Sequence, residues 1–247
     1  MDKSDYFFEL YTGLPRGGPG DNESTRRAYN CMENLPSEPL ILDIGCGPGM
    51  QTLELARISG GKIIALDNHQ GFLDKLKKDA NNEKLDDQIE IRNQSMLEMD
   101  FEDGTFDIIW SEGALYFMGF QNGLKKCRQL LKDKGYLAIT QAVYLQKEVP
   151  EEVIQYWDSE YDDIDQIENT MELIKKVGFD LISHFKLPVS SWMDNYYDPM
   201  SKRIIELEEK YKDNETALKV LNASRDEIEF FKKYSDYYGY EFFIMRK

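Results

Sequence analysis

The sequence has few cysteines and only two histidines, which limits the chemistry open to it. Cys31, Cys46 and Cys127 are odd in number and far apart, whereas a disulfide framework or a cysteine metal site needs a regular spacing. His69 and His184 stand alone, without matched metal ligands. We therefore expect neither disulfide bonds nor a bound metal, and the scattered cysteines favour a reducing cytoplasm.

Long apolar runs and an excess of basic residues are also missing. No apolar run reaches the roughly 18 residues needed to cross a bilayer, and the N-terminal stretch "MDKSDYFFELY" lacks the basic start and apolar core of a signal peptide. The 46 acidic residues outnumber the 30 basic ones and give a formal charge of -16, which would repel nucleic acids and anionic membranes. We expect a soluble, cytoplasmic protein that binds neither nucleic acids nor membranes. The sequence predicts no particular oligomeric state.

Short apolar runs alternate with amphipathic ones along most of the chain, a pattern typical of helices packed on a parallel sheet. Runs rich in apolar residues predict strands at 40–45, 62–67, 88–93, 106–111, 135–140, 179–188 and 240–247. Amphipathic runs predict helices at 50–59, 71–82, 124–132 and 167–178. The expected fold class is α/β, with a doubly wound and mostly parallel sheet.

A glycine-rich loop links the first expected strand to the first expected helix. In "LILDIGCGPGMQT" the glycines Gly45, Gly47 and Gly49 occupy every second position. They permit backbone conformations closed to other residues and leave room for a ligand near the positive end of the helix. An NTPase loop would need Lys and Ser or Thr where Met50 and Gln51 stand, and a dinucleotide loop would need glycine at position 50. A tight turn without a ligand is the alternative.

Asp67 ends the second expected strand, about 20 residues after this loop. From that position a carboxylate can accept hydrogen bonds from both hydroxyls of a ribose. Together the loop and Asp67 indicate a nucleoside ligand without a diphosphate.

These features resemble class I S-adenosylmethionine-dependent methyltransferases over residues 39–140. "LDIGCGPG" and the strand ending in Asp67 resemble motif I and its successor, "MDFEDGTFDIIWSEGALYFMG" resembles the fourth-strand region, and "LLKDKGYLAIT" the fifth strand. Within the family the chain is most similar to the enzymes of ubiquinone and menaquinone biosynthesis. The resemblance implies a Rossmann-like, seven-stranded sheet, S-adenosylmethionine as cofactor, and methyl transfer to an O, N or C atom of a small molecule.

We expect one domain over residues 1–247, in four parts. These are an N-terminal cap (1–36), a cofactor-binding core (37–188), a helical insertion (189–238) and a final strand (239–247). The cap contains a Gly/Pro-rich loop and a helix that Asp21 or Asn22 would cap. The resemblance implies that this helix covers the cofactor, while the Gly17 to Gly20 loop either contacts the methionine portion or is a linker.

The resemblance also implies roles for residues around the glycine loop. Asp43 would contact the amino group of the cofactor's methionine portion, directly or through water. Asp67 would bind the ribose hydroxyls, and Asn68 would lie along the adenine. The backbone that would face the methionine portion belongs to Gly45, Cys46, Gly47 and Gly49.

After the third expected strand the sequence departs from the family pattern. Many relatives carry an Asp there that accepts from the adenine amino group, whereas "NQSM" places Ser95 at that position. A serine hydroxyl can accept the same hydrogen bond without charge, Gln94 can share it, and the Met96 backbone N–H can donate to the ring. An ordinary turn hydroxyl is the alternative for Ser95.

Glu112 and Gly113 follow the fourth expected strand, where the resemblance implies that they border the methionine portion. Glu112 would neutralise the cofactor's amino group or bind a cationic acceptor, and a solvated surface carboxylate is the alternative. The stretch "SEGALY" lacks the Asn-Pro-Pro-Tyr or Asp-Pro-Pro-Tyr signature of nucleic-acid amino-methyltransferases. This again disfavours a nucleic-acid substrate.

Aromatic residues outside the core pattern predict the acceptor pocket. Tyr116, Trp192 and Tyr196, with Trp157 and Tyr197, would surround a flat or cationic group. The alternative is that these rings only pack the added helices onto the sheet.

No catalytic residue is assigned, because an in-line methyl transfer mainly requires positioning. Glu112, Tyr116 and His184 are equal candidates for a base. The alternative function is a non-catalytic S-adenosylmethionine-binding or scaffold protein with the same fold, and a nicotinamide dehydrogenase is more distant.

Overall fold

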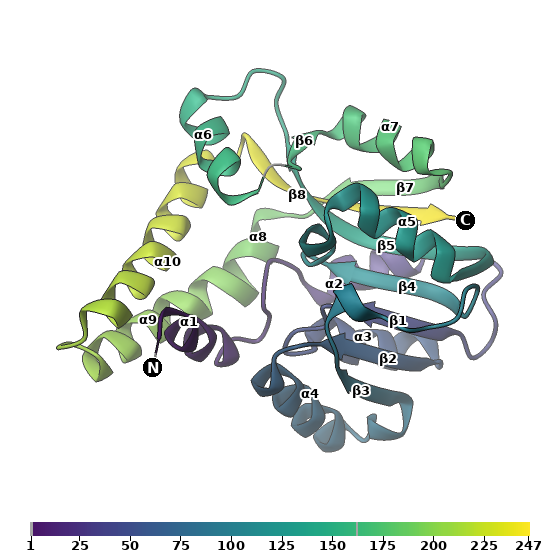
Figure 1. The fold of residues 1–247 in the computed structure, drawn as a ribbon, viewed down its shortest axis with the longest axis horizontal. Helices are drawn as coiled ribbons and strands as arrows, with labels where there is room; N and C mark the ends of the chain where they lie inside the picture. Colours follow the sequence, from purple (N-terminus) through teal and green to yellow (C-terminus); the bar gives the residue numbers. More distant parts are fainter. Residues whose placement is uncertain (1, 162) are drawn as a thin grey trace.

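The computed structural model describes residues 2–161 and 163–247. They form one mixed β-sheet with helices around it (Figure 1). The main path of the sheet has the strand order β3-β2-β1-β4-β5-β8-β7. Pairs from β3 to β5 are parallel, whereas β8 is antiparallel to both β5 and β7. The strands are β1 (Leu40–Ile44), β2 (Lys62–Asp67), β3 (Ile89–Asn93), β4 (Phe106–Glu112), β5 (Leu131–Tyr144), β7 (Asp180–Lys186) and β8 (Tyr238–Arg246). This confirms the expected doubly wound, mostly parallel seven-stranded arrangement.

Two details of the sheet differ from the prediction. β5 extends well beyond 135–140, because its far half pairs with β8 as far as Tyr144 opposite Tyr238. A short strand, β6 (Asp165–Gln166), pairs with the end of β5 off the main path. Two residues are too few for a periodic pattern, so the sequence does not predict β6.

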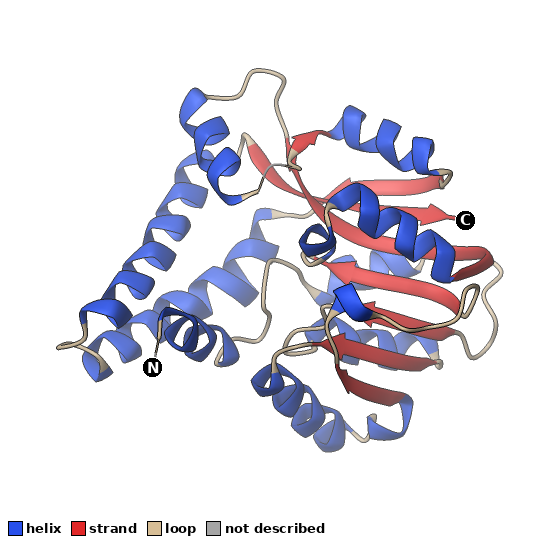
Figure 2. Ribbon diagram, in the orientation of Figure 1, coloured by secondary structure: helices blue, strands red, loops and turns tan. Residues whose placement is uncertain are grey.

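Helices cover both faces of the sheet (Figure 2). Side chains alternate along each strand, so Ile41 packs with α2, α3 and α4 on one face while Leu42 packs with α5 and α7 on the other. Both cores are fully buried at these strand positions. The helices are α2 (Asn22–Tyr29), α3 (Met50–Ser59), α4 (Gln70–Glu83), α5 (Phe120–Leu130) and α7 (Ile167–Val177), with single turns η1 (Asp86–Gln88), η2 (Met96–Glu98) and η3 (Leu115–Met118).

A third group of helices lies beyond one end of the sheet. Figure 1 shows α1, α9 and α10 side by side there, and they contact one another. They share a separate apolar core in which the Trp192 and Phe231 rings stack with centroids 4.4 Å apart. The elements of this group are α1 (Lys3–Thr12), α6 (Glu151–Glu160), α8 (Val189–Trp192), the π-helical turn η4 (Met193–Tyr197), α9 (Asp198–Lys210) and α10 (Glu215–Tyr234).

The N-terminal helices were predicted only in part. Asp21 caps α2, because its Oδ1 accepts a hydrogen bond from the Ser24 backbone N–H at 2.7 Å, as predicted. The sequence pattern does not predict α1, nor does it predict α6 later in the chain.

In the part of the chain that the structure describes, no helix combines the length and apolar character needed to cross a membrane.

Candidate active site

A cavity of about 980 Å³ lies at the carboxyl ends of the parallel strands, where they face the third group of helices. Ligands of open α/β sheets bind at this edge. The described lining includes every residue predicted to bind the cofactor or the acceptor except Asp43 and Gly49. The volume of the cavity lies at the upper end of the range of about 300–1,000 Å³ that is typical of small-molecule sites.

The glycine loop between β1 and α3 forms the floor of one end of the cavity. Gly45 and Gly47 have positive φ angles of 69° and 53°, a region that favours glycine. A Cβ atom at Gly45 would lie only 2.4 Å from the Cβ of Ala114. Close packing therefore requires glycine at position 45, and the loop backbone stays open toward the cavity.

Asp67 links this loop to the start of α4 through two hydrogen bonds. Its Oδ2 accepts from the Gly47 backbone N–H and its Oδ1 from the His69 backbone N–H, both at 2.9 Å. Each carboxylate oxygen keeps a further lone pair. Asp67 can therefore accept hydroxyl hydrogen bonds from a ligand while it holds the loop.

Asp43 lies behind the loop rather than in the cavity wall, and it is fully buried. Its Oδ2 accepts from Thr52 Oγ1 at 2.6 Å and from Gln51 Nε2 at 3.3 Å, while Oδ1 has no partner among the described residues. Burial raises the pKa of the Asp43 carboxyl to about 7, against the lowering effect of the Thr52 hydrogen bond. This geometry gives no support to a direct cofactor contact, and the water-mediated contact stays a prediction.

Glu112 is buried, so the expected alternative of a solvated surface carboxylate is wrong. Its Oε1 accepts from Trp110 Nε1 at 2.8 Å and from Thr25 Oγ1 at 3.0 Å, and its Oε2 forms an ion pair with Arg16 Nη2. Arg16 and Glu112 side chains are 3% and 1% exposed. The pair therefore joins the N-terminal segment to the end of β4 inside the cavity wall.

The polar groups after β3 are engaged in local contacts. Ser95 Oγ accepts from the Leu97 backbone N–H at 3.2 Å, as in the predicted alternative of a turn hydroxyl. Gln94 Nε2 donates to the Glu98 carbonyl at 2.8 Å and to Asp100 Oδ1 at 3.1 Å. Both residues still line the cavity, together with Asn68 and Met96, so their predicted adenine contacts stay predictions.

The other end of the cavity is aromatic. Tyr116, Trp192 and Tyr196 line it. Their rings also contact the rings of Tyr161, Phe231 and Tyr197, and Trp192 contacts Tyr240 of β8, so these aromatic side chains also pack the insertion together and against the sheet. His184 does not line the cavity, because it lies on β7 and its Nδ1 contacts Glu241 Oε1 at 2.5 Å. His184 is therefore wrong as a candidate base.

Several residues of the site were missed by sequence reasoning. Arg16 comes from the loop before α2, Tyr240 from β8 and Glu227 from α10, and all three line the cavity. The Gly/Pro-rich stretch around Arg16 was a usable signal. Glu227 gave none, because it stands in a highly charged helix among many exposed carboxylates.

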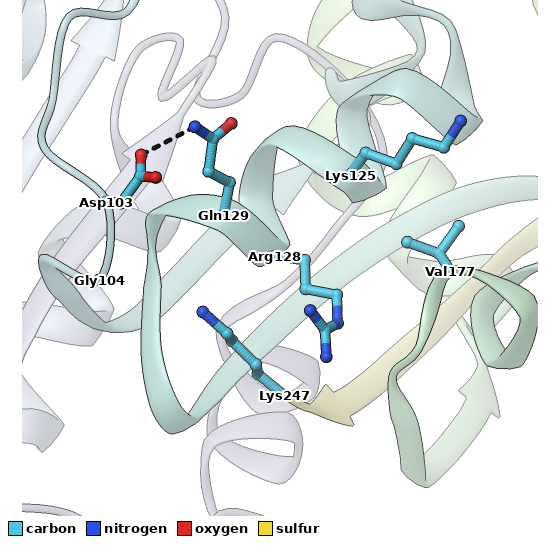
Figure 3. A pocket seen from close by; sticks show the side chains of 7 residues that line it. All are labelled: Asp103, Gly104, Lys125, Arg128, Gln129, Val177 and Lys247. Carbon is cyan, nitrogen blue, oxygen red and sulfur yellow. Dashed lines mark hydrogen bonds between the residues drawn. The ribbon is translucent and has the colours of Figure 1, made fainter.

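A second pocket of about 550 Å³ lies at the opposite edge of the sheet and contains no predicted site residue. Figure 3 shows its basic side chains and the 2.8 Å hydrogen bond from Gln129 to Asp103. Its lining residues are Asp103, Gly104, Lys125, Arg128, Gln129, Val177 and Lys247. Within residues 2–161 and 163–247, no cluster of three or more His, Cys, Asp or Glu side chains could hold a metal ion.

Comparison with known proteins identifies the core of the chain. Residues 41–135 match the family model of the methyltransferase domain. This part of the chain is therefore similar to methyltransferase domains. The match begins in β1, includes the glycine loop and Asp67, and ends in β5.

Curated relatives resemble this part of the chain over part of their own length. Sterol 24-C-methyltransferase of Saccharomyces cerevisiae is 31% identical over 109 residues, which cover 44% of this chain and 28% of that protein. The enzyme of the same name from Eremothecium gossypii is 27% identical over 156 residues, 60% of this chain and 42% of that protein. The chain thus spans less than half of the length of these two relatives.

Solved structures resemble the chain over nearly its whole length, the added helices included. A SAM-dependent methyltransferase from Geobacter sulfurreducens, in complex with S-adenosyl-L-homocysteine, has a TM-score of 0.86, with 17% identity over 98% of this chain and 97% of that chain. A second, from Thiobacillus denitrificans, has a TM-score of 0.82, with 17% identity over 98% and 96%. At this identity the likeness establishes the fold alone.

The raised pKa of Asp43 predicts a specific dependence of stability on pH. Between about pH 4 and pH 7 the folded protein keeps a proton that the unfolded chain has lost, so the free energy of unfolding falls as the pH rises through this interval. Because an amide does not titrate in this range, Asp43→Asn should remove this fall in the free energy of unfolding. Relative to the wild type without ligand, the variant should gain on the order of 2–4 kcal/mol between pH 4 and pH 8.

Chemical denaturation at a series of pH values measures this difference. Asp213→Asn, in the exposed turn between α9 and α10, is the matched control and should follow the wild type. Parallel pH curves for Asp43→Asn and the wild type would contradict the buried, proton-binding Asp43.

Proposed function

We propose that this protein is an S-adenosylmethionine-dependent methyltransferase that acts on a small molecule. The observation that carries the proposal is the continuous cavity that runs from the glycine loop and Asp67 to a wall of aromatic side chains. One end suits a nucleoside cofactor and the other an organic acceptor. Bound S-adenosylmethionine would supply a methyl group made electrophilic by its sulfonium, so the chain's task is to position the two ligands.

The polar groups at the cofactor end fit this ligand. Asp67 has acceptor capacity for two ribose hydroxyls, beside Asn68 and the predicted adenine region of Gln94, Ser95 and Met96. Gly45, Cys46, Gly47 and Gly113 line the route to the methionine portion, with Gly49 and Asp43 behind them.

Arg16 supports a further assignment at the methionine end. Its Nε and Nη1 atoms are buried without hydrogen-bond partners among the described residues, although its Nη2 contacts Glu112. Unsatisfied buried donors are costly, and a planar guanidinium matches a carboxylate. We assign Arg16 to the carboxylate of the cofactor's methionine portion.

The subfamily and the cellular setting of the protein rest on other observations. The relatives named above are sterol 24-C-methyltransferases, so the expected ubiquinone and menaquinone type stays a prediction. The net charge of -16 favours a small acceptor over nucleic acid or a membrane surface, and the widely spaced thiols favour the cytoplasm. The acceptor atom, O, N or C, and a catalytic base remain unassigned.

Calorimetry with S-adenosylhomocysteine, NAD and ATP tests the cofactor. We expect S-adenosylhomocysteine to bind at least about tenfold more tightly than the other two, a difference of about 1.4 kcal/mol. Tight binding of NAD with no binding of S-adenosylhomocysteine would overturn the proposal. Incubation of the protein with labelled S-adenosylmethionine and a metabolite extract then separates turnover from the non-catalytic alternative, because only an enzyme accumulates S-adenosylhomocysteine above the rate without protein.

Arg16→Lys tests the assignment of the methionine end. Lys keeps the charge beside Glu112 but loses the planar fork, so we expect S-adenosylhomocysteine to bind about tenfold more weakly. Binding of 5′-methylthioadenosine, which lacks the amino-acid group, should change less than about twofold.

The matched control is Arg225→Lys on α10, where Arg225 forms a surface ion pair with Glu208. It should bind both ligands like the wild type. Equal losses for both ligands in Arg16→Lys would point to a general disturbance of the cavity and contradict the assigned role.

A further inference from the structure

Tyr240 of β8 places an uncommitted hydroxyl in the wall of the cavity. Its Oη forms no hydrogen bond with any residue of 2–161 or 163–247, and the surrounding protein does not enclose this atom. Tyr240 also lines the cavity. The hydroxyl is therefore open to a ligand, with one donor and one acceptor function to offer.

Strand pairing and packing fix the place of the Tyr240 ring. Its backbone pairs with Ala142 of β5, and its carbonyl accepts a hydrogen bond from the Leu187 backbone N–H at 2.9 Å. The Trp192 ring lies edge-on, with centroids 4.9 Å apart. A Cβ atom at Gly113 would lie 3.1 Å from the Tyr240 ring and 3.3 Å from its Oη.

Gly113 relates this hydroxyl to the two proposed ligands. Gly113 follows β4 directly, has a positive φ angle of 65° and lines the cavity. It is predicted to border the methionine portion of the cofactor, and because glycine has no side chain, the Tyr240 hydroxyl can lie beside that portion. Trp192 belongs to the aromatic end of the cavity. Tyr240 thus lies at the junction of the two ends, where a methyl group would be transferred.

The chemical state of this hydroxyl suits hydrogen bonding rather than proton removal. Burial raises the pKa of the Tyr240 phenol above its usual value, so the group keeps its proton at neutral pH. Glu112, which precedes Gly113, already accepts on Oε1 from Trp110 and Thr25 and on Oε2 from Arg16. Of these two polar groups that adjoin Gly113, only the Tyr240 hydroxyl is without a partner among the described residues.

We propose that Tyr240 Oη holds the nucleophilic atom of the acceptor by a hydrogen bond, and that this atom is a nitrogen or oxygen that carries hydrogen. The phenol oxygen accepts the N–H or O–H of the acceptor, which leaves a lone pair of the same atom to face the methyl group. A carbon nucleophile offers no such donor. This inference rests on the proposed function, because it requires S-adenosylmethionine at the glycine loop.

The transfer balances without a proton on Tyr240. The lone pair of the acceptor atom forms the bond to the methyl carbon, while the carbon–sulfur bond breaks and leaves its electron pair on sulfur. The acceptor atom then carries the positive charge, and its proton passes to water. Tyr240 stays a neutral phenol throughout and contributes orientation.

Sinefungin tests the place of the hydroxyl. In this analogue of S-adenosylmethionine a carbon with an amino group replaces the sulfur with its methyl group, so the amine should donate to Tyr240 Oη. Tyr240→Phe removes only the hydroxyl. By calorimetry we expect sinefungin to bind the variant about tenfold more weakly than the wild type, because a hydrogen bond to a charged group is lost. S-adenosylhomocysteine has no group at that place, and its affinity should change less than about twofold.

The matched control is Tyr237→Phe in the turn before β8. Tyr237 does not line the cavity, so this variant should bind both ligands like the wild type. Unchanged binding of sinefungin in Tyr240→Phe, or equal losses for both ligands, would overturn the inference.

A ¹³C-methyl label on S-adenosylmethionine tests the nature of the acceptor atom. After incubation with a metabolite extract, the ¹³C chemical shift of the product distinguishes a methyl group on nitrogen or oxygen from one on carbon. We expect the former, formed about tenfold more slowly by Tyr240→Phe than by the wild type or Tyr237→Phe at saturating cofactor. A methyl group on carbon, or equal rates for the three proteins, would contradict the role of Tyr240.

The inference and the proposed function fail separately. Binding of S-adenosylhomocysteine to the wild type without a selective loss of sinefungin in Tyr240→Phe overturns only the inference. Absence of S-adenosylhomocysteine binding overturns the proposed cofactor. Binding without any labelled product above the rate without protein would contradict both the proposed methyl transfer and the inference.

Discussion

The buried ion pair between Arg16 and Glu112 holds the N-terminal segment against the sheet, and the shape of the cavity depends on it. Glu112 ends β4, whereas Arg16 and Thr25 reach it from the loop and helix before β1. Removing either charge would leave the other buried and unpaired, at a cost of about 3–5 kcal/mol. The same loop also contacts the insertion, since the Gly20 backbone N–H donates to the Ser191 carbonyl at 3.1 Å. Sheet, N-terminal segment and insertion thus form one wall.

The two ends of the cavity differ chemically because the sheet forms one end and the insertion forms the other. The sheet contributes the glycine loop and Asp67, which hold each other through the Gly47 backbone N–H at 2.9 Å. The insertion contributes rings and one carboxylate, Glu227, to the same cavity. The proposed methyl transfer requires that a charged nucleoside be held beside a second molecule while water is excluded. The arrangement meets both needs with side chains that largely serve packing as well.

The sequence predicted the parts of the fold that depend on local pattern. Strands β1 to β4 and helix α3 carry strong periodicity, and the glycine loop and Asp67 have a recognisable spacing, so these positions agree with the structure. Contacts between distant segments were not predictable in this way. Arg16 meets Glu112 across 96 positions, and Glu227 reaches the cavity only because α10 packs beside α1. His184 failed as a candidate because sequence alone does not say which side of an edge strand faces the site.

The central claim is that one cavity holds the cofactor at the loop and the acceptor at the aromatic end. A crystal structure of the protein soaked with S-adenosylhomocysteine tests it most directly. The account predicts the ribose on Asp67, the methionine carboxylate on Arg16 and the sulfur beside Gly113, with the aromatic end left open. Adenine stacked among Trp192 and Tyr196, or the ligand in the basic pocket near Lys125 and Arg128, would contradict it.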